Sequence, residues 1–156
     1  AAGNDSKDLD VENKYPSDSY DGAPEISNNV LIIGALAPDY GSKMVAGFSN
    51  YGKKNVDIYA PGVQIYATTP DQTYEYLGGT SMASPNTAGV AAMIRSYYPK
   101  LSASQVKQII MESGTPLKNT VTVGEDKHKV NFADASKTGK IVNAYNALLM
   151  AEKMSK

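Results

Sequence analysis

The segment Gly79–Ala92, with the sequence GTSMASPNTAGVAA, decides the fold that we predict for this chain. A tight Gly-Thr turn leads into a run of small residues, which predicts a helix over about 81–97 that Pro99 stops. The first N–H groups of a helix have no partner within it, so they point at whatever contacts Ser81. Small side chains let such a helix lie close to a sheet. The segment therefore predicts an accessible serine hydroxyl on a rigid element.

Apolar runs on either side of this helix predict an α/β structure. The run 29–35 is typical of a strand buried on both faces, and shorter strands are expected at 57–60 and 64–68. Ser102 with Gln105 three residues later forms a capping box that begins a second helix, which ends at Gly114. We expect a surface loop over 5–29, a loose hairpin around 124–126 and a last helix from Asn143.

Length and composition indicate one domain over residues 1–156. The net charge of −1 does not indicate a protein that binds nucleic acid or an anionic membrane surface. No apolar run approaches the roughly 20 residues of a membrane span. The absence of cysteine excludes disulfides and thiol nucleophiles. The first residues, Ala-Ala-Gly-Asn, contain neither Met nor a basic leader, so we expect a start within a longer protein.

Ser81 is the candidate nucleophile. A serine needs a neighbouring base and donors for the developing oxyanion, and its own N–H at a helix start is suited to be one donor. The alternative is that Ser81 only caps the helix, which is the common role of a serine in this position.

The serine segment resembles the active-serine segment of the subtilisin-like (subtilase) serine peptidases. The resemblance implies a partial subtilisin-like three-layer α/β domain, with an incomplete, mostly parallel sheet and packed helices. Other segments match family motifs in the family's order: Ala1–Asp5, the pair Tyr15-Pro16 (often a cis peptide in the family), Asn29–Ala35, Phe48–Gly52, Asp57–Gly62, and Gly139 with Val142–Ala144.

The resemblance also implies roles for single residues. Ser81 would attack the peptide carbonyl and carry the acyl-enzyme, and the Asn4 amide would donate to the oxyanion. Four residues beside them would line the substrate site: Ala2, Gly3, Gly79 and Thr80.

Two departures from the family pattern affect these expectations. The family's histidine after Ser-Pro is replaced by Asn86, which we expect to change packing only. The family's catalytic Asp and His segments precede the asparagine motif, at which this chain begins. We therefore expect the isolated chain to be inactive and to need the upstream part of the same protein to cleave a polypeptide. His128 is the only histidine and lies in a charged stretch, typical of a surface residue.

Two other functions compete with the peptidase. An α/β-hydrolase would use Ser81 with Asp126 and His128, but an acid and a base two residues apart do not suit that fold. A pseudo-peptidase or protein-interaction module would keep Ser81 without using it. Upstream sequence distinguishes the peptidase from the module, because only the peptidase requires intact Asp and His segments.

The remaining expectations concern ions, assembly and location. Asp5, Asp8 and Asp10 are expected to be solvated, and no cofactor or metal site is predicted, although the resemblance allows a weak structural cation such as calcium near Asp39. If a strand before Asn4 is missing, the strand edge at 30–33 is unpaired and the chain self-associates. A secreted, periplasmic or cell-surface location is expected from the resemblance.

Overall fold

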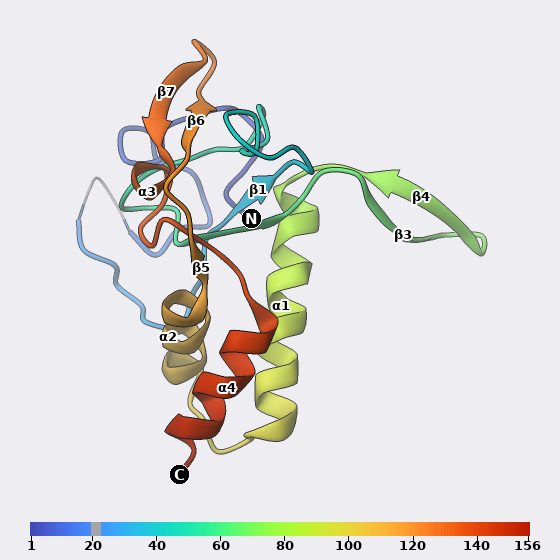
Figure 1. The fold of residues 1–156 in the computed structure, drawn as a ribbon, viewed down its shortest axis with the longest axis vertical. Helices are drawn as coiled ribbons and strands as arrows, with labels where there is room; N and C mark the ends of the chain where they lie inside the picture. The colour runs from blue at the N-terminus through green and yellow to red at the C-terminus, as the bar shows by residue number, and fades with distance from the viewer. Residues whose placement is uncertain (20–22) are drawn as a thin grey trace.

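The computed structural model describes residues 1–19 and 23–156, and its main sheet has four strands in the order β1-β2-β8-β5 (Figure 1). β1 (Ile33–Leu36), β2 (Ile58–Pro61) and β8 (Lys140–Ile141) are parallel, whereas β5 (Thr115–Pro116) is antiparallel to β8. This is the incomplete, mostly parallel sheet that the sequence predicts.

Three helices cover one face of the sheet: α1 (Thr80–Tyr97), α2 (Ala103–Ser113) and α4 (Ala144–Met154) (Figure 1). Alternate residues of a strand face opposite sides, so Ile33 and Ala35 of β1 pack toward these helices together with Ile58 and Ala60 of β2. From α1, small side chains such as Ala83 enter this core, which lets the helix approach the strands.

The second face of the sheet is covered by irregular segments and one hairpin. The hairpin joins β6 (Thr120–Val123) to β7 (His128–Asn131), and the short helix α3 (Phe132–Ala135) follows it. The Tyr59 ring is fully buried on this face and packs against Phe132, with ring centroids 5.4 Å apart. A Cβ on Gly34 would lie 2.3 Å from this ring, so only glycine fits opposite Tyr59 in the strand register.

Most predicted elements are confirmed, with boundaries shifted by a few residues. The capping box at Ser102, the last helix beginning next to Asn143, the hairpin around 124–126 and the cis Tyr15-Pro16 peptide are all present. The strand expected at 29–35 is shorter and begins only at Ile33. The strand expected at 64–68 is present as β3 (Ile65–Thr69). The strand that pairs with it, β4 (Thr73–Leu77), was not predicted, and the two form a hairpin separate from the main sheet.

The edge of β1 is covered in part. Ala2 donates its N–H to Ile33 O, and Ala46 donates to Ala35 O. The self-association that we expected from this edge stays a prediction. Among the helices of the described residues, none has the length and apolar character to cross a membrane.

A buried charge cluster ties the loop after Tyr15-Pro16 to the core. Lys107 of α2 places Nζ 3.0 Å from Glu25, 3.5 Å from Asp18 and 3.8 Å from Asp57. The other carboxylate oxygen of Asp57 accepts the Ile32 N–H at 2.7 Å. The side chains of Lys107, Asp18 and Asp57 are all less than a tenth exposed. Burial raises the pKa of the Asp57 carboxyl from 3.8 to about 6, against the opposing effect of Lys107.

The close approach of Gly34 and Tyr59 predicts a large effect from one methyl group. Gly34→Ala should lower the free energy of unfolding by about 1–3 kcal/mol, because the added Cβ overpacks a rigid ring. Gly89→Ala is the matched control, since a Cβ there meets nothing within 4 Å and alanine favours a helix. Urea unfolding followed by circular dichroism measures both. A Gly34→Ala protein as stable as its parent would contradict this packing.

The raised pKa of Asp57 predicts a pH-dependent difference between the parent chain and Asp57→Asn. Between pH 4 and 6 the folded chain holds a proton on Asp57 that the unfolded chain releases, so this group's contribution to stability is lost as pH rises. The asparagine side chain of the variant does not titrate. Urea unfolding should therefore show the parent losing about 2 kcal/mol relative to the variant from pH 4 to 7. A difference that stays constant with pH would show that Asp57 titrates normally.

Candidate active site

Ser81 lies in the first turn of α1, at the end of the connection that leaves β4 through Gly78 and Gly79. Ser81 is exposed to solvent, whereas the two residues before it, Gly79 and Thr80, are buried. The next two N–H groups, of Met82 and Ala83, turn back to Gly79 O. Among the described residues, neither the N–H nor the hydroxyl of Ser81 has a hydrogen-bond partner. Both groups are therefore open to an incoming molecule.

Asn4 is held beside this turn by Thr80. Its Oδ1 accepts the Thr80 N–H at 3.0 Å and the Thr80 hydroxyl at 2.8 Å. With Oδ1 occupied in this way, the amide group Nδ2 is the remaining hydrogen-bonding end of the side chain. Nδ2 lies 3.3 Å from the place that a Cβ on Gly79 would take, next to the Ser81 turn. The structure thus brings together the two residues predicted as nucleophile and oxyanion donor, which lie 77 positions apart by number (81 against 4).

Asn50 fixes the backbone on both sides of Asn4. Its Oδ1 accepts the N–H groups of Asp5 and Lys7 at 3.0 and 2.9 Å, and its Nδ2 donates to Ala2 O at 2.9 Å. The Asn50 N–H donates to Gly3 O at 2.9 Å. Asn50 itself is fully buried, and its bond to Ala2 O is buried as well, so water competes little for its amide.

The expected substrate-lining residues lie around Asn4, but their polar groups are already used. Thr80 is 1% exposed, and its hydroxyl also accepts the Gly3 N–H at 3.1 Å. This burial contradicts a substrate contact by the Thr80 side chain and gives it a positioning role. Ala2 is equally buried, and the Lys14 side chain lies against Gly3. The burial of Ala2 likewise contradicts a substrate contact by its side chain. At the half-buried Gly3, the N–H and the carbonyl oxygen are used by Thr80 and Asn50.

Sequence reasoning did not find the roles of Asn50 and Thr80. Asn50 was visible within the Phe48–Gly52 motif, but its partners are more than 40 residues away along the chain. Asn86, which replaces the family's histidine, donates Nδ2 to Pro61 O at 2.9 Å. It joins α1 to the end of β2, in keeping with the packing role expected for it.

His128 is placed away from Ser81. Its Nδ1 lies 2.7 Å from Asp126 Oδ1, and its ring meets the Tyr51 ring edge-on at 5.6 Å. The pairing with His128 lowers the pKa of Asp126. No contact joins this pair to Ser81 within the described part of the chain. The α/β-hydrolase interpretation, which requires Asp126 and His128 to serve Ser81, is therefore not supported by the geometry.

The acidic residues near Asn4 accept hydrogen bonds from backbone N–H groups or form an ion pair with a lysine. Asp10 accepts the N–H groups of Lys54 and Asn55, Asp8 accepts the Asp10 N–H, and Asp5 pairs with Lys14. Lys14 lowers the pKa of Asp5. Within residues 1–19 and 23–156, no three acidic, histidine or cysteine residues gather as a metal site would require. Asp39, the other residue considered for a cation, is exposed.

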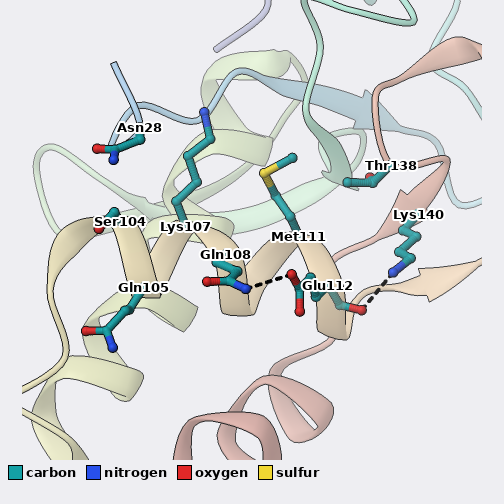
Figure 2. A pocket seen from close by; sticks show the side chains of 9 residues that line it. All are labelled: Asn28, Ser104, Gln105, Lys107, Gln108, Met111, Glu112, Thr138 and Lys140. Carbon is teal, nitrogen blue, oxygen red and sulfur yellow. Dashed lines mark hydrogen bonds between the residues drawn. The ribbon is translucent and has the colours of Figure 1, made fainter. Parts of the chain in front are cut away.

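A cavity of about 580 Å³ lies on α2 and not at Ser81 (Figure 2). Figure 2 shows that most of its lining side chains come from α2, with Asn28, Thr138 and Lys140 closing it from other segments. Most of the polar lining groups are already engaged: Gln108 donates to Glu112, Lys140 donates to Glu112 O, and Lys107 donates to Glu25. The cavity includes neither Ser81 nor Asn4, so we place the candidate active site by its hydrogen-bond geometry.

An exposed helix-start serine beside an oriented asparagine amide is the constellation of a serine-peptidase oxyanion site. The profile of the subtilase family (peptidase S8) matches residues 1–131. The chain belongs to this family, whose members are serine endopeptidases.

Relatives and solved structures agree with this assignment. Subtilisin DY of Bacillus licheniformis is 42% identical over 112 residues, which are 72% of this chain and 39% of that protein. M-protease of Shouchella clausii (strain KSM-K16) is 44% identical over 96 residues, 62% of this chain and 24% of that protein. A structure of the subtilase cytotoxin SubAB assembly superimposes with a TM-score of 0.75 at 26% identity, covering 99% of this chain and 48% of that chain. The chain thus spans less than half the length of these proteins.

The Thr80 contacts predict a measurable change at Asn4. Thr80→Val keeps the shape of the side chain but removes the hydroxyl that serves Asn4 and Gly3, which should cost about 1–3 kcal/mol of stability. The Asn4 side-chain amide should then broaden or split in a ¹H–¹⁵N NMR spectrum. Thr87→Val is the control, because that buried hydroxyl bonds only Ala83 O. An unchanged Asn4 signal in Thr80→Val would contradict the positioning role.

Proposed function

We propose that this chain is the C-terminal part of the catalytic domain of a subtilisin-like serine endopeptidase. In this proposal, Ser81 attacks the carbonyl carbon of a peptide bond in a polypeptide substrate and forms an acyl-enzyme. The observation that carries the proposal is the pair of hydrogen bonds from Thr80 to Asn4 Oδ1, which turn the amide end of Asn4 toward the serine.

The oxyanion has two donors in this arrangement. As Ser81 Oγ bonds to the carbonyl carbon, negative charge develops on the carbonyl oxygen, and Asn4 Nδ2 and the Ser81 N–H stabilise it. Both donors are pre-oriented, so little reorganisation is needed as the charge develops. The positive end of the α1 dipole acts in the same direction.

The proton of Ser81 requires a base that these residues do not supply. The sole histidine is paired with Asp126 and packed on Tyr51. We therefore assign the base and its orienting carboxylate to the upstream part of the same protein, as in the family's Asp, His, Ser order. Alone, the chain keeps the oxyanion donors without the base, and only a small residual rate is expected.

The relatives bear on the location of the protein, and the contacts of Asn4 bear on the competing interpretation. Subtilisin DY and M-protease are bacterial subtilisin-type proteases, and by their similarity we propose a location outside the cytoplasm for this protein. A pseudo-peptidase or interaction module would not need the oxyanion geometry to be maintained. The intact contacts between Asn4 and Thr80 therefore favour the peptidase.

Labelling with a fluorophosphonate serine-hydrolase probe tests the proposal. Intact-mass analysis of the folded chain should show no adduct, because Ser81 lacks its base. A polypeptide that also includes the upstream Asp and His segments should give one adduct per chain, which Ser81→Ala abolishes. Failure of that longer protein to react would favour the pseudo-peptidase. A stoichiometric adduct on the isolated chain that His128→Ala removes would show that His128 is the base and overturn our assignment.

A further inference from the structure

The hairpin of β3 and β4 extends away from the sheet and the helices (Figure 1) and has an exposed aromatic face. Tyr66, Tyr74 and Tyr76 are 60%, 58% and 71% exposed. The ring centroid of Tyr66 lies 4.9 Å from that of Tyr76 and 5.6 Å from that of Tyr74. The three rings therefore form one continuous surface, which we call the tyrosine face.

The strand register explains why the rings gather on one side. Tyr66 pairs directly with Tyr76, and Tyr74 pairs with Thr68, two residues along β3 from Tyr66. Since alternate residues of a strand share a face, all three rings point to the same side. A two-stranded hairpin is marginally stable by itself in water. Within the described residues, this hairpin forms a sheet of only two strands, so the outer edges of β3 and β4 can accept a further strand.

The hairpin is also acidic. Asp71 at its tip is exposed, Glu75 is exposed on the face of β4 opposite the rings, and residues 62–79 contain no Lys, Arg or His. Tyrosine rings attract cations through their faces, most often the guanidinium of arginine. Rings and carboxylates together suit a polypeptide segment with basic side chains.

The tyrosine face is close to the candidate active site along the chain. β4 ends at Leu77, and the chain reaches Ser81 four residues later. Tyr76 is therefore within about 17 Å of Ser81, taking at most roughly 3.3 Å per residue. An extended substrate whose carbonyl lies at Ser81 needs about five residues to cover that distance.

We propose that the tyrosine face binds an extended, basic segment of the polypeptide substrate, about five or more residues from the bond that Ser81 attacks. This inference rests on the proposed function for its position relative to the cleavage site. Arginine side chains stack on the rings, Asp71 at the hairpin tip adds negative charge nearby, and the peptide backbone pairs with an open strand edge, as in other complexes that form by strand addition.

Binding of labelled peptides to the Ser81→Ala chain tests the inference without catalysis. The probe is a fluorescein-labelled decapeptide of alternating Arg and Thr, compared with one of alternating Glu and Thr, by fluorescence anisotropy. The Arg peptide should bind at least tenfold more tightly than the Glu peptide. Replacing all three tyrosines of the face with alanine should weaken Arg-peptide binding at least tenfold. The matched control replaces three tyrosines elsewhere that are at least as exposed: Tyr40, Tyr97 and Tyr145.

Three outcomes would overturn the inference. Equal binding by the parent and the tyrosine-face variant would show that the rings do not contact the peptide, and equal losses in both triple variants would show a general effect of removing tyrosines. Tyrosine-dependent binding to anionic phospholipid vesicles, without peptide binding, would assign the face to a membrane. Failure of the probe labelling described above leaves peptide binding unaffected, so the two proposals fail separately. Circular dichroism checks that each variant is folded.

Discussion

The buried amide of Asn50 is the interaction on which the candidate site depends. It joins segments more than 40 residues apart and bonds the backbone on either side of Asn4, at Ala2, Asp5 and Lys7. A buried amide must satisfy its polar atoms, and here those partners set the path of the chain that carries Asn4. Neighbouring Ser49 donates to Asn50 O and accepts the Ala35 N–H, which connects the same loop to the sheet. The position of Asn4 therefore follows from the core of the domain.

The serine is held by a second set of contacts that meets the first at Thr80. Gly79 donates its N–H to Gly62 O at 2.7 Å, so the turn before α1 is fixed to the end of β2. A Cβ on Gly62 would come within 2.8 Å of Gly79 O, and this close approach requires glycine. The Thr80 hydroxyl then joins the serine turn to both Gly3 and Asn4. The relative position of nucleophile and donor amide is thus determined by buried contacts on both sides.

Local signals account for what the sequence predicted correctly. The capping box at Ser102, the turn at 124–126 and the small residues of the serine helix each act over a few residues. β5 and β8 were missed because each has two residues and is defined only by pairing with a distant strand, β8 with β2 and β5 with β8. The burial of Lys107 and the positioning roles of Thr80 and Asn50 were missed for the same reason, since partners distant in sequence create them. Ser81 could be singled out from its place at a helix start, whereas Asn4 became a candidate donor only because whole motifs resemble a family.

The most direct test of the account is the turnover number of the protease that joins this chain to its upstream Asp and His segments, measured with and without the Asn4 amide. In subtilisin, loss of the corresponding asparagine amide lowers turnover by about 10²–10³-fold. We predict a loss in that range for Asn4→Ala, with little change in KM, because the amide acts on charge that develops only in the transition state. An Asn4→Ala enzyme with turnover equal to its parent would contradict the claim that this fold is built to hold that amide beside Ser81.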